Sequence, residues 1–376
     1  MQPKTEIPIT DLVEALAVEA RDFDRRRQAQ AAVWKGEQVE YLPLLIGGGA
    51  VPEAAGVPRY NLEQQWYSPE LMLREGLYAM LSVARSGSEA VPSIRPNLGV
   101  GTLATVFGVH QSVFPDKMPW VTRHLTFDEI EAFEPGDISS KGILPRALDY
   151  LAWFREQLGD AGNVYLADTQ APFDIAHLVA GDRIFTDIFD QPAHVHRLMR
   201  DCTAVYIEAT RLMKQAAGED ATAHHHSNTL YSPVCGARAC EDTSLLLSPP
   251  LFAEFSLPYL TEAIEPFGAW VHWCGDAKHI MRDWISMDKS FCINFGNPES
   301  YDWAEIMQLC RQANTLVFGG PPREPGETLQ NYHRRVLAYL AGEQRLLLFY
   351  PCGWSAGESC TEQLDCWHAT QDEVFH

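Results

Sequence analysis

The sequence predicts an α/β protein, specifically a (β/α)8 TIM barrel with an N-terminal helical extension and loop insertions. Short apolar segments alternate with helical segments of about 12 to 18 residues, which is typical of βαβ units and a parallel sheet. Several such units follow one another, and polar residues or glycines gather where each apolar segment ends. A doubly wound sheet would need a glycine-rich nucleotide turn after its first strand, and the sequence offers no convincing one.

Composition narrows the class of protein further. The chain has 376 residues, of which 46% are hydrophobic and 21% charged, so a large core can form. A formal net charge of −21 argues against nucleic acids and anionic membranes as partners, because both attract basic surfaces. Nine cysteines without a disulfide-framework spacing indicate a reducing compartment. Without a signal peptide or an apolar stretch near the roughly 18 residues of a membrane helix, we expect a cytoplasmic protein.

The elements are expected in the following order along two regions, a helical extension over residues 1–40 and the barrel over residues 41–376. Apolar residues have helical spacing in the extension, and the charged residues 21–27 are expected to continue it as a solvent-facing segment. The first half of the barrel is expected to contain a strand at 41–46, a helix at 69–86, a loop-rich insertion at 93–124, a helix at 145–158 and a strand at 163–168.

The second half continues the alternation, with one unusual segment. Three consecutive histidines at 224–226 predict a short strand from which one or two of the rings face the site. The remaining expected segments are helices beginning near 175 and spanning 192–214, 249–267, 303–314 and 328–341, strands at 269–273, 291–295, 315–318 and 346–350, and a final helix within 355–376.

A candidate metal site lies at the end of the strand that leads to His272. On a strand, residues two apart point the same way, so His272 and Cys274 can share one target. An imidazole nitrogen and a thiolate facing one point make half of a tetrahedral zinc site. Cys352, which also ends an apolar strand and precedes a glycine, is the best candidate for a third ligand. The alternative is that these cysteines are only small buried hydrophobic residues.

A separate candidate for substrate recognition is Arg95, in the loop Arg-Pro-Asn-Leu-Gly at the start of the insertion. Its guanidinium can grip a carboxylate or a phosphate, and the same loop can equally be a structural turn.

With these residues in place, the chain resembles the uroporphyrinogen decarboxylase superfamily. The closer likeness is to its zinc methyltransferase branch, which includes the methylcobamide:coenzyme M methyltransferases. The matching segments are residues 168–176, which resemble the T-x-P-F-x-x-A loop, residues 248–252 with 258–260, the His272-x-Cys274-Gly275 motif, and Cys352 with Gly353. The likeness covers roughly residues 41–353, and the three metal-ligand positions are its most specific part.

The resemblance has two departures. The arginine-rich N-terminal motif of true uroporphyrinogen decarboxylases is not recognisable, and those enzymes are metal-free, so decarboxylation of a tetrapyrrole is not expected. The insertion around residues 95–120 is more elaborate than in the coenzyme M enzymes, so the second substrate can differ from coenzyme M.

The resemblance implies a zinc-dependent methyltransferase. Zinc bound by His272, Cys274 and Cys352 keeps an open position, at which a thiol substrate can become a thiolate. That thiolate, or a tetrahydrofolate-type acceptor, would exchange a methyl group with a corrinoid, either free cobalamin or a corrinoid protein. Glu241 or Asp242 is a candidate for the fourth position.

The same mouth of the barrel should contain groups that contact the substrate. Asp168 and Asn297, at strand ends, could hydrogen-bond the substrate, although Asp168 could also brace a helix or a loop. Among the three histidines, His225 or His226 could contact the substrate, and His226 is the candidate chosen. A homodimer is compatible with this interpretation.

Two other functions stay open. The first is a metal-free decarboxylase or lyase that uses Asp168 and the Arg95 loop on a carboxylated substrate. The second is a non-catalytic module that binds a corrinoid or tetrapyrrole at the barrel mouth. A pure protein that holds no zinc would favour the first over the methyltransferase. Tight corrinoid binding with no turnover would favour the second.

Overall fold

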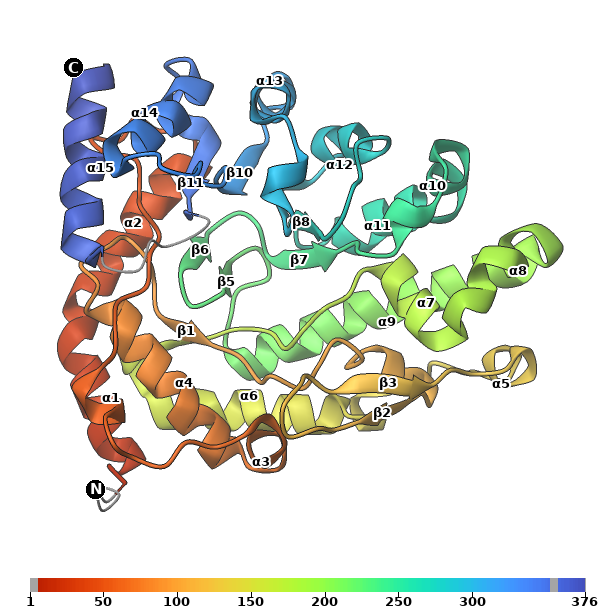
Figure 1. Ribbon diagram of the computed structural model, residues 1–376. Coiled ribbons are helices and arrows are strands. Elements are labelled where there is room, and N and C mark those ends of the chain that lie inside the picture. The colour runs from red at the N-terminus through yellow and green to blue at the C-terminus, as the bar shows by residue number, and fades with distance from the viewer. Residues whose placement is uncertain (1–5, 352–357, 376) are drawn as a thin grey trace.

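Parallel strands form most of a ring in the computed structural model, which describes residues 6–351 and 358–375 (Figure 1). One sheet is hydrogen-bonded in the order β11-β10-β9-β8-β7, with every pair parallel. Its strands are β7 (Ala237–Cys240), β8 (Ala269–Trp273), β9 (Ser290–Phe295), β10 (Leu316–Gly319) and β11 (Leu347–Phe349).

The ring closes through shorter segments. Strands β1 (Ser93–Ile94) and β4 (Asn163–Val164) pair in parallel. Parallel bridges join Leu44 to Phe349 and Gln170 to Cys240, so the segments before β1 and after β4 reach the two edges of the larger sheet. The backbone N–H of Glu89 donates to the carbonyl of Leu44 (3.3 Å), which links the first segment to the second. The predicted (β/α)8 barrel is therefore confirmed.

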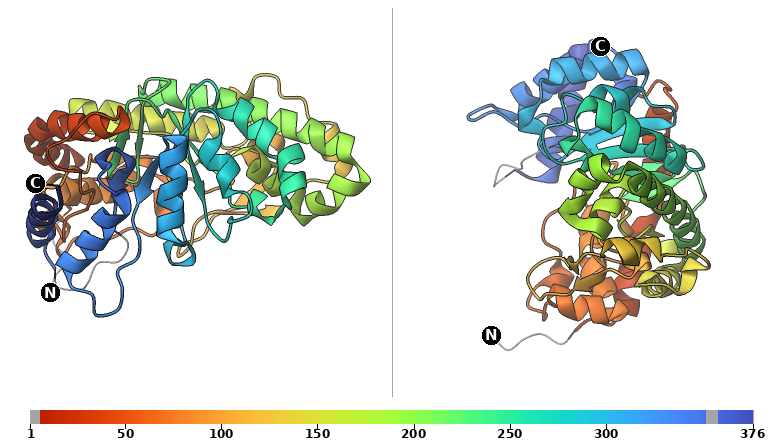
Figure 2. Two further views of the ribbon diagram at one scale, coloured as in Figure 1. Left: turned by 90° about the horizontal axis from the view of Figure 1, so that it is seen from above. Right: turned by 90° about the vertical axis from the view of Figure 1, so that its right-hand side faces the viewer.

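Helices cover the outside of this ring, as the two further views show (Figure 2). They pack on it through their apolar faces because each strand has apolar side chains on its outer side. In chain order the helices of the described residues are α1 (Ile9–Glu19), α2 (Phe23–Trp34), α3 (Leu62–Tyr67), α4 (Pro69–Ala84), α5 (Phe127–Glu131), α6 (Leu144–Leu158), α7 (Pro172–Ala180), α8 (Ile184–Asp190), α9 (Pro192–Ala217), α10 (Pro249–Phe255), α11 (Leu257–Ile264), α12 (Met281–Ser286), α13 (Trp303–Ala313), α14 (Leu329–Leu340) and α15 (Cys360–Phe375). No helix in the described ranges is long and apolar enough to cross a bilayer.

The three histidines form the predicted strand, β5 (His224–His226), which turns back into the antiparallel strand β6 (Leu230–Ser232). The turn has positive φ at Ser227 (52°) and Asn228 (57°), a conformation that asparagine tolerates better than most residues. Asn228 accepts a hydrogen bond from the backbone of Ser93 (2.9 Å) at the beginning of β1. The hairpin therefore lies at the amino-terminal end of the barrel strands, which we call the barrel floor.

The predicted loop-rich insertion contains a second hairpin, β2 (His110–Ser112) and β3 (Trp120–Arg123), which pair antiparallel. It extends away from the ring on the same side as α7 and α8 (Figure 1). Trp120 is 55% exposed on it, which is unusual for so large an apolar side chain.

The helical extension differs from its prediction in one respect. The charged segment 21–27 is not wholly solvent-facing, because Arg26 is 3% exposed. Its guanidinium donates to the carbonyls of Val83 (3.2 Å), Ala84 (2.6 Å) and Ala90 (3.1 Å). The last carbonyls of α4 have no partner within their own helix, and the buried arginine satisfies that of Ala84 and shares that of Val83 with Ser86. The extension is therefore tied to the barrel, and the boundary at residues 40 and 41 stays a prediction.

The prediction of a single helix at 249–267 is wrong, because the helix is interrupted at Ser256, between α10 and α11. The break precedes Pro258, which cannot donate a backbone hydrogen bond and disfavours helical geometry in the residue before it. The hydroxyl of Ser256 turns inward and donates to a carboxylate oxygen of Glu241 (3.2 Å).

Candidate metal centre

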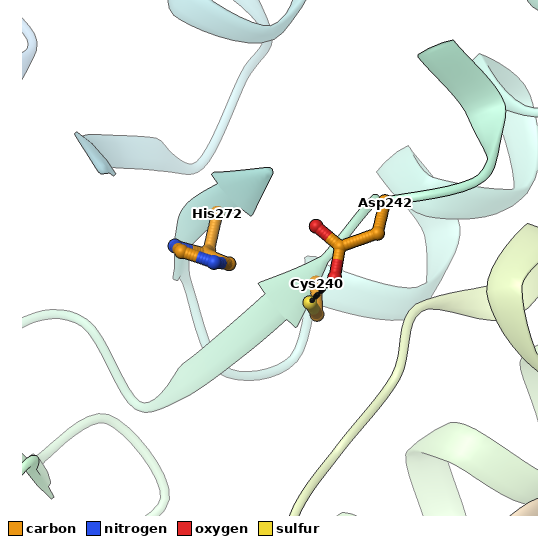
Figure 3. A group of neighbouring side chains, drawn as sticks. All are labelled: Cys240, Asp242 and His272. Carbon is orange, nitrogen blue, oxygen red and sulfur yellow. Dashed lines mark hydrogen bonds between the residues drawn. The ribbon is translucent and has the colours of Figure 1, made fainter. Parts of the chain in front are cut away.

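Four side chains meet at the carboxyl ends of β7 and β8, and we call them the mouth cluster: Cys240, Asp242, His272 and Cys274. The two strands are parallel, with Cys240 paired to His272. Because strand residues alternate between the two faces, Cys240 and Asp242 point inward from one strand and His272 and Cys274 from the next. Ligand atoms of Cys240, Asp242 and His272 all lie within 4.8 Å of one another (Figure 3).

The imidazole of His272 is held in the state that binds a metal. Its Nδ1 lies 2.5 Å from Oδ1 of Asn294, whose amide nitrogen donates to the carbonyl of Phe318 (2.6 Å). The Asn294 oxygen must therefore accept, so Nδ1 carries the proton and Nε2 keeps its lone pair. Burial, followed by the charge of Arg238, lowers the pKa of His272 to about 4, so the ring is neutral at physiological pH.

Cys274 is the exposed thiol of the cluster. Its Sγ lies 3.4 Å from Nε2 of His272, and its backbone N–H donates to Oδ1 of Asp242 (2.6 Å). Burial and the nearby Asp242 raise the pKa of Cys274 to about 11, so the metal-free residue is a thiol. A Cβ on Gly296 would come within 2.5 Å of the sulfur, which explains why a glycine occupies that position.

A second layer fixes Asp242. Its backbone N–H donates to the buried carboxylate of Asp174 (2.8 Å), which also accepts from the backbone of Thr243 (2.7 Å). Burial, followed by the charge of Glu241, raises the pKa of Asp174 well above its ordinary value. On its other side Asp242 accepts from the thiol of Cys240 (Oδ2 to Sγ, 3.2 Å), so each carboxylate oxygen has a partner.

Two arginines lie below the cluster around one carboxylate. Arg95 donates to Asp168 (2.9 Å), and Arg238 lies 3.5 Å from the other oxygen of Asp168, to which Gln170 also donates (2.6 Å). Burial opposes the ionisation of Asp168, but the charges of Arg95 and Arg238 outweigh it and lower its pKa to about 2. The barrel interior therefore has more positive than negative charge at this level.

Two cavities border the mouth cluster or the residues that contact it. One of about 440 Å³ has Asp242, Gln170 and Trp120 in its wall, and one of about 220 Å³ is lined by Asn294 and Gly296. These volumes suit small molecules or parts of them. A larger cavity of about 730 Å³ lies beside residues 47–52 and includes none of the cluster residues in its lining.

Comparison with known proteins identifies the family. The sequence profile of uroporphyrinogen decarboxylase (URO-D) matches residues 26–320. The chain belongs to the uroporphyrinogen decarboxylase family. A methyltransferase from Methanosarcina mazei has a similar structure, with a TM-score of 0.65 at 18% identity, covering 93% of this chain and 99% of that one. This likeness establishes the fold alone.

A second solved structure is more distant. It is a B12-independent methionine synthase from Shewanella sp. W3-18-1 in complex with selenomethionine, with a TM-score of 0.44 at 12% identity, covering 89% of this chain and 97% of that one. A search of curated proteins found no match.

In this uroporphyrinogen decarboxylase family member, the predicted His272 and Cys274 lie together, and Cys352 lies outside the described residues. Asp242 is near them. Glu241, the other candidate for a fourth ligand, is fully buried and receives a hydrogen bond from Ser256. Burial raises the pKa of Glu241 to about 7.

The other predicted site residues lie around this centre. Asn297 accepts from the backbone of Gly275 (2.8 Å), and so braces the loop after Cys274. His226 is buried at the barrel floor, with its ring 4.7 Å from that of Trp270. Burial, followed by the charges of Arg238 and Arg95, lowers the pKa of His226 well below its ordinary value. Catalytic roles for Asp168, Asn297 and His226 stay predictions.

Sequence reasoning missed Cys240, Asn294 and Arg238. For Cys240 a signal was present, because Cys-x-Asp has the same two-residue spacing as His-x-Cys and follows a short strand. The inward positions of β7 are polar, so the segment lacks the apolar pattern of a strand and was predicted as a loop. The pairing of Asn294 with His272 depends on the register of β8 and β9, which no local pattern contains.

Proposed function

We propose that this family member is a zinc-dependent methyltransferase that moves a methyl group between a corrinoid and a thiol or a tetrahydrofolate-type acceptor. The observation that carries the proposal is the His272–Cys274 pair, in which a neutral imidazole offers Nε2 beside a thiol at the barrel mouth. TIM-barrel enzymes have their active sites at this end of the strands. The similar fold of a methyltransferase from Methanosarcina mazei agrees with this class of reaction.

The donor set fits zinc. Nitrogen and sulfur ligands with a free coordination position are typical of catalytic zinc, and Asn294 Oδ1 is an oxygen acceptor for the other ring nitrogen, as metal-binding histidines commonly have. We propose His272, Cys274 and Cys352 as the ligands, with Asp242 beside them. A bound zinc ion supplies the Lewis acidity that turns a coordinated thiol into a thiolate at neutral pH.

The protein's own residues would do the positioning. Asn294 keeps the proton on Nδ1 of His272, so Nε2 stays free throughout. Asp242 holds the backbone of Cys274, and Asn297 holds that of Gly275, so the exposed sulfur stays at the opening. Arg95 and Asp168 can hydrogen-bond the polar groups of a substrate that enters between the two cavities. The corrinoid, free or bound to a partner protein, would supply the bond to the transferred methyl group, whose making and breaking is the difficult chemistry.

The test is an anaerobic assay in which methylcobalamin loses its methyl group to a small thiol, followed by corrinoid absorbance, with tetrahydrofolate as the second acceptor. Removing a zinc ligand should cost at least the roughly 10- to 100-fold typical of an outer-shell partner, so we expect Cys274→Ser to lose about 100-fold or more. Cys366→Ser, on α15, is the matched control and should keep the wild-type rate.

A specific observation favours a second candidate, a metal-free decarboxylase or lyase. Asp168 lies between the guanidinium groups of Arg95 and Arg238, an arrangement that could hold a carboxylated substrate. Turnover of a carboxylated substrate that is indifferent to chelator and to Cys274→Ser would support this reaction and contradict methyl transfer. A cytoplasmic location and a homodimer stay proposals.

A further inference from the structure

Cys240 is a second thiol at the barrel mouth that the proposed zinc site does not use. We propose that Cys240 is a metal ligand, and that Cys240, Asp242 and His272 form one binding position for a divalent cation of the zinc class. The inference rests on the proposed function in that both place a metal at His272.

The geometry of the donor atoms supports the proposal. The sulfur of Cys240, a carboxylate oxygen of Asp242 and a ring nitrogen of His272 lie within 4.8 Å of one another. A tetrahedral ion with bonds of about 2.0 to 2.3 Å separates its donors by roughly 3.2 to 3.8 Å. The most widely separated pair would therefore have to approach by at most about 1 to 1.6 Å to surround an ion.

The sulfur of Cys240 has polar partners on two sides. Arg238 donates to it from Nη2 (3.3 Å). The S–H donates to Oδ2 of Asp242 (3.2 Å), so the proton lies between two atoms that both bind cations. A divalent ion that displaces this proton would be bound by the sulfur and the carboxylate together.

Outer partners hold each of the three donors. Asn294 orients His272, the backbone of Cys274 fixes Oδ1 of Asp242, and Asp174 anchors the Asp242 backbone. Cys240 is paired with His272 in the β7–β8 register and is 1% exposed. Such a supported arrangement is typical of metal sites and is unnecessary for a cysteine that only fills space.

The two thiols would then have different roles around one histidine. Cys240 is buried and Cys274 is exposed, and both belong to the mouth cluster. Cys240 and Asp242 would hold the ion from the buried side, and Cys274, a ligand in the proposed zinc site, would hold it from the exposed side. Removing Cys274 would therefore take away one ligand and leave the buried ones in place.

The experiment is cobalt(II) titration of the purified full-length protein, with the near-ultraviolet thiolate-to-cobalt absorption as the measure of bound sulfurs. We expect Cys240→Ser to lose the absorption of one thiolate and to weaken cobalt binding by about 10-fold or more. Cys274→Ser should keep the absorption due to Cys240, and Asp242→Asn should weaken binding without changing the absorption per bound ion. Cys366→Ser is the matched control and should behave as wild type.

Wild-type absorption and affinity in Cys240→Ser would overturn the proposal. If the serine variant does not fold, as judged by circular dichroism, Cys240→Ala replaces it and Asp242→Asn supplies the independent reading. The outcome is separable from that of the proposed function. Cobalt bound through Cys240 in a protein that moves no methyl group from methylcobalamin would contradict only the function, whereas methyl transfer with an unchanged Cys240→Ser spectrum would contradict only the ligand.

Discussion

Histidines lie beside carboxylates at both ends of the barrel, but in different electrical surroundings. At the floor, Glu219 accepts from the backbone of His225 (2.7 Å), from its Nδ1 (3.0 Å) and from the ammonium of Lys214 (3.2 Å). His224 lies beside the same carboxylate, with Nδ1 3.5 Å from it. The floor therefore contains its own cation, and its charges are balanced inside the protein.

At the mouth, the guanidinium of Arg238 lies against Cys240 and Asp168, whereas Asp242 has no ion pair with a lysine or arginine among the described residues. Asp242 is paired with a thiol and a backbone N–H, and His272 presents a free lone pair to Cys274. A carboxylate that has no lysine or arginine partner, beside two thiols and a neutral imidazole, suits a metal cation, whereas a carboxylate paired with a lysine does not. The run of three histidines is the more conspicuous motif in the sequence, yet the shorter His-x-Cys motif has the features of a metal centre.

The largest expected effect is on the stability contributed by the ion pair of Glu219 and Lys214 at the floor. Glu219→Gln removes the charge that balances Lys214 and leaves a buried ammonium without a counter-ion. Breaking a buried pair in this way typically costs about 3 to 5 kcal/mol, so we expect that loss in the free energy of unfolding. Urea denaturation measures it, and metal content should not change in the folded fraction. A loss below about 0.5 kcal/mol would contradict a stabilising role for this pair.

The next effect belongs to the mouth. Asn294→Ala removes the group that orients His272, so both ring tautomers become available and Nε2 is no longer always free. We expect metal affinity to fall by about 10- to 100-fold, with a loss of about 1 to 3 kcal/mol in stability because the Phe318 carbonyl loses its donor. A competition titration with a chromophoric chelator measures the affinity. Equal affinity in the variant and the wild type would mean that Asn294 only fills space.

A smaller effect concerns the stability of the protein at acidic pH. Burial lowers the pKa of His224 to about 4, although the nearby Glu219 opposes this shift. Between the ordinary value of 6.5 and about 4 the unfolded chain takes up a proton that the folded chain refuses, so stability falls as the pH decreases through this window. The slope should be about 1.4 kcal/mol per pH unit for this histidine.

Glu219 acts in a more acidic window than His224. Burial raises its pKa, but His224, His225 and Lys214 outweigh burial and hold the pKa well below its ordinary value of 4.5. The stability that Glu219 contributes is present above that value and is lost as the pH falls below it. Thermal denaturation of the metal-free protein at pH 7, 6 and 5 therefore reports on the buried histidines, among them His226 and His272, and the variant His224→Gln isolates the part due to His224. The curve of His224→Gln should be flatter than that of wild type, and parallel curves would contradict the assignment.

The barrel could be predicted from the sequence because its signal is repeated along the whole chain. Alternating apolar strands and amphipathic helices, with polar strand ends, leave few other folds. The split of α10 from α11 at Ser256 had a signal in Pro258, which the continuing apolar pattern outweighed. The hydrogen bond from Ser256 to Glu241 had none, because Glu241 follows β7 and is distant in sequence. Arg26 was misjudged for a related reason, since the carbonyls that bury it lie at the end of α4.

The site could be predicted where its residues are adjacent in sequence. His272 and Cys274 share a strand, so strand geometry alone places them together. Cys240 and Asn294 come from the strands on either side, and their contacts with His272 depend on register. The three histidines of β5 are the opposite case. They form a conspicuous local motif, but the fold places them at the barrel floor, away from the mouth cluster.

The central claim is that the mouth, and not the floor, holds a metal. Elemental analysis after zinc reconstitution tests it in wild type, His272→Ala and the matched floor variant His225→Gln. We expect about one zinc per chain in wild type and in His225→Gln, and less than about a tenth of that in His272→Ala. Retention of zinc by folded His272→Ala, or a wild-type protein that takes up none, would contradict the account.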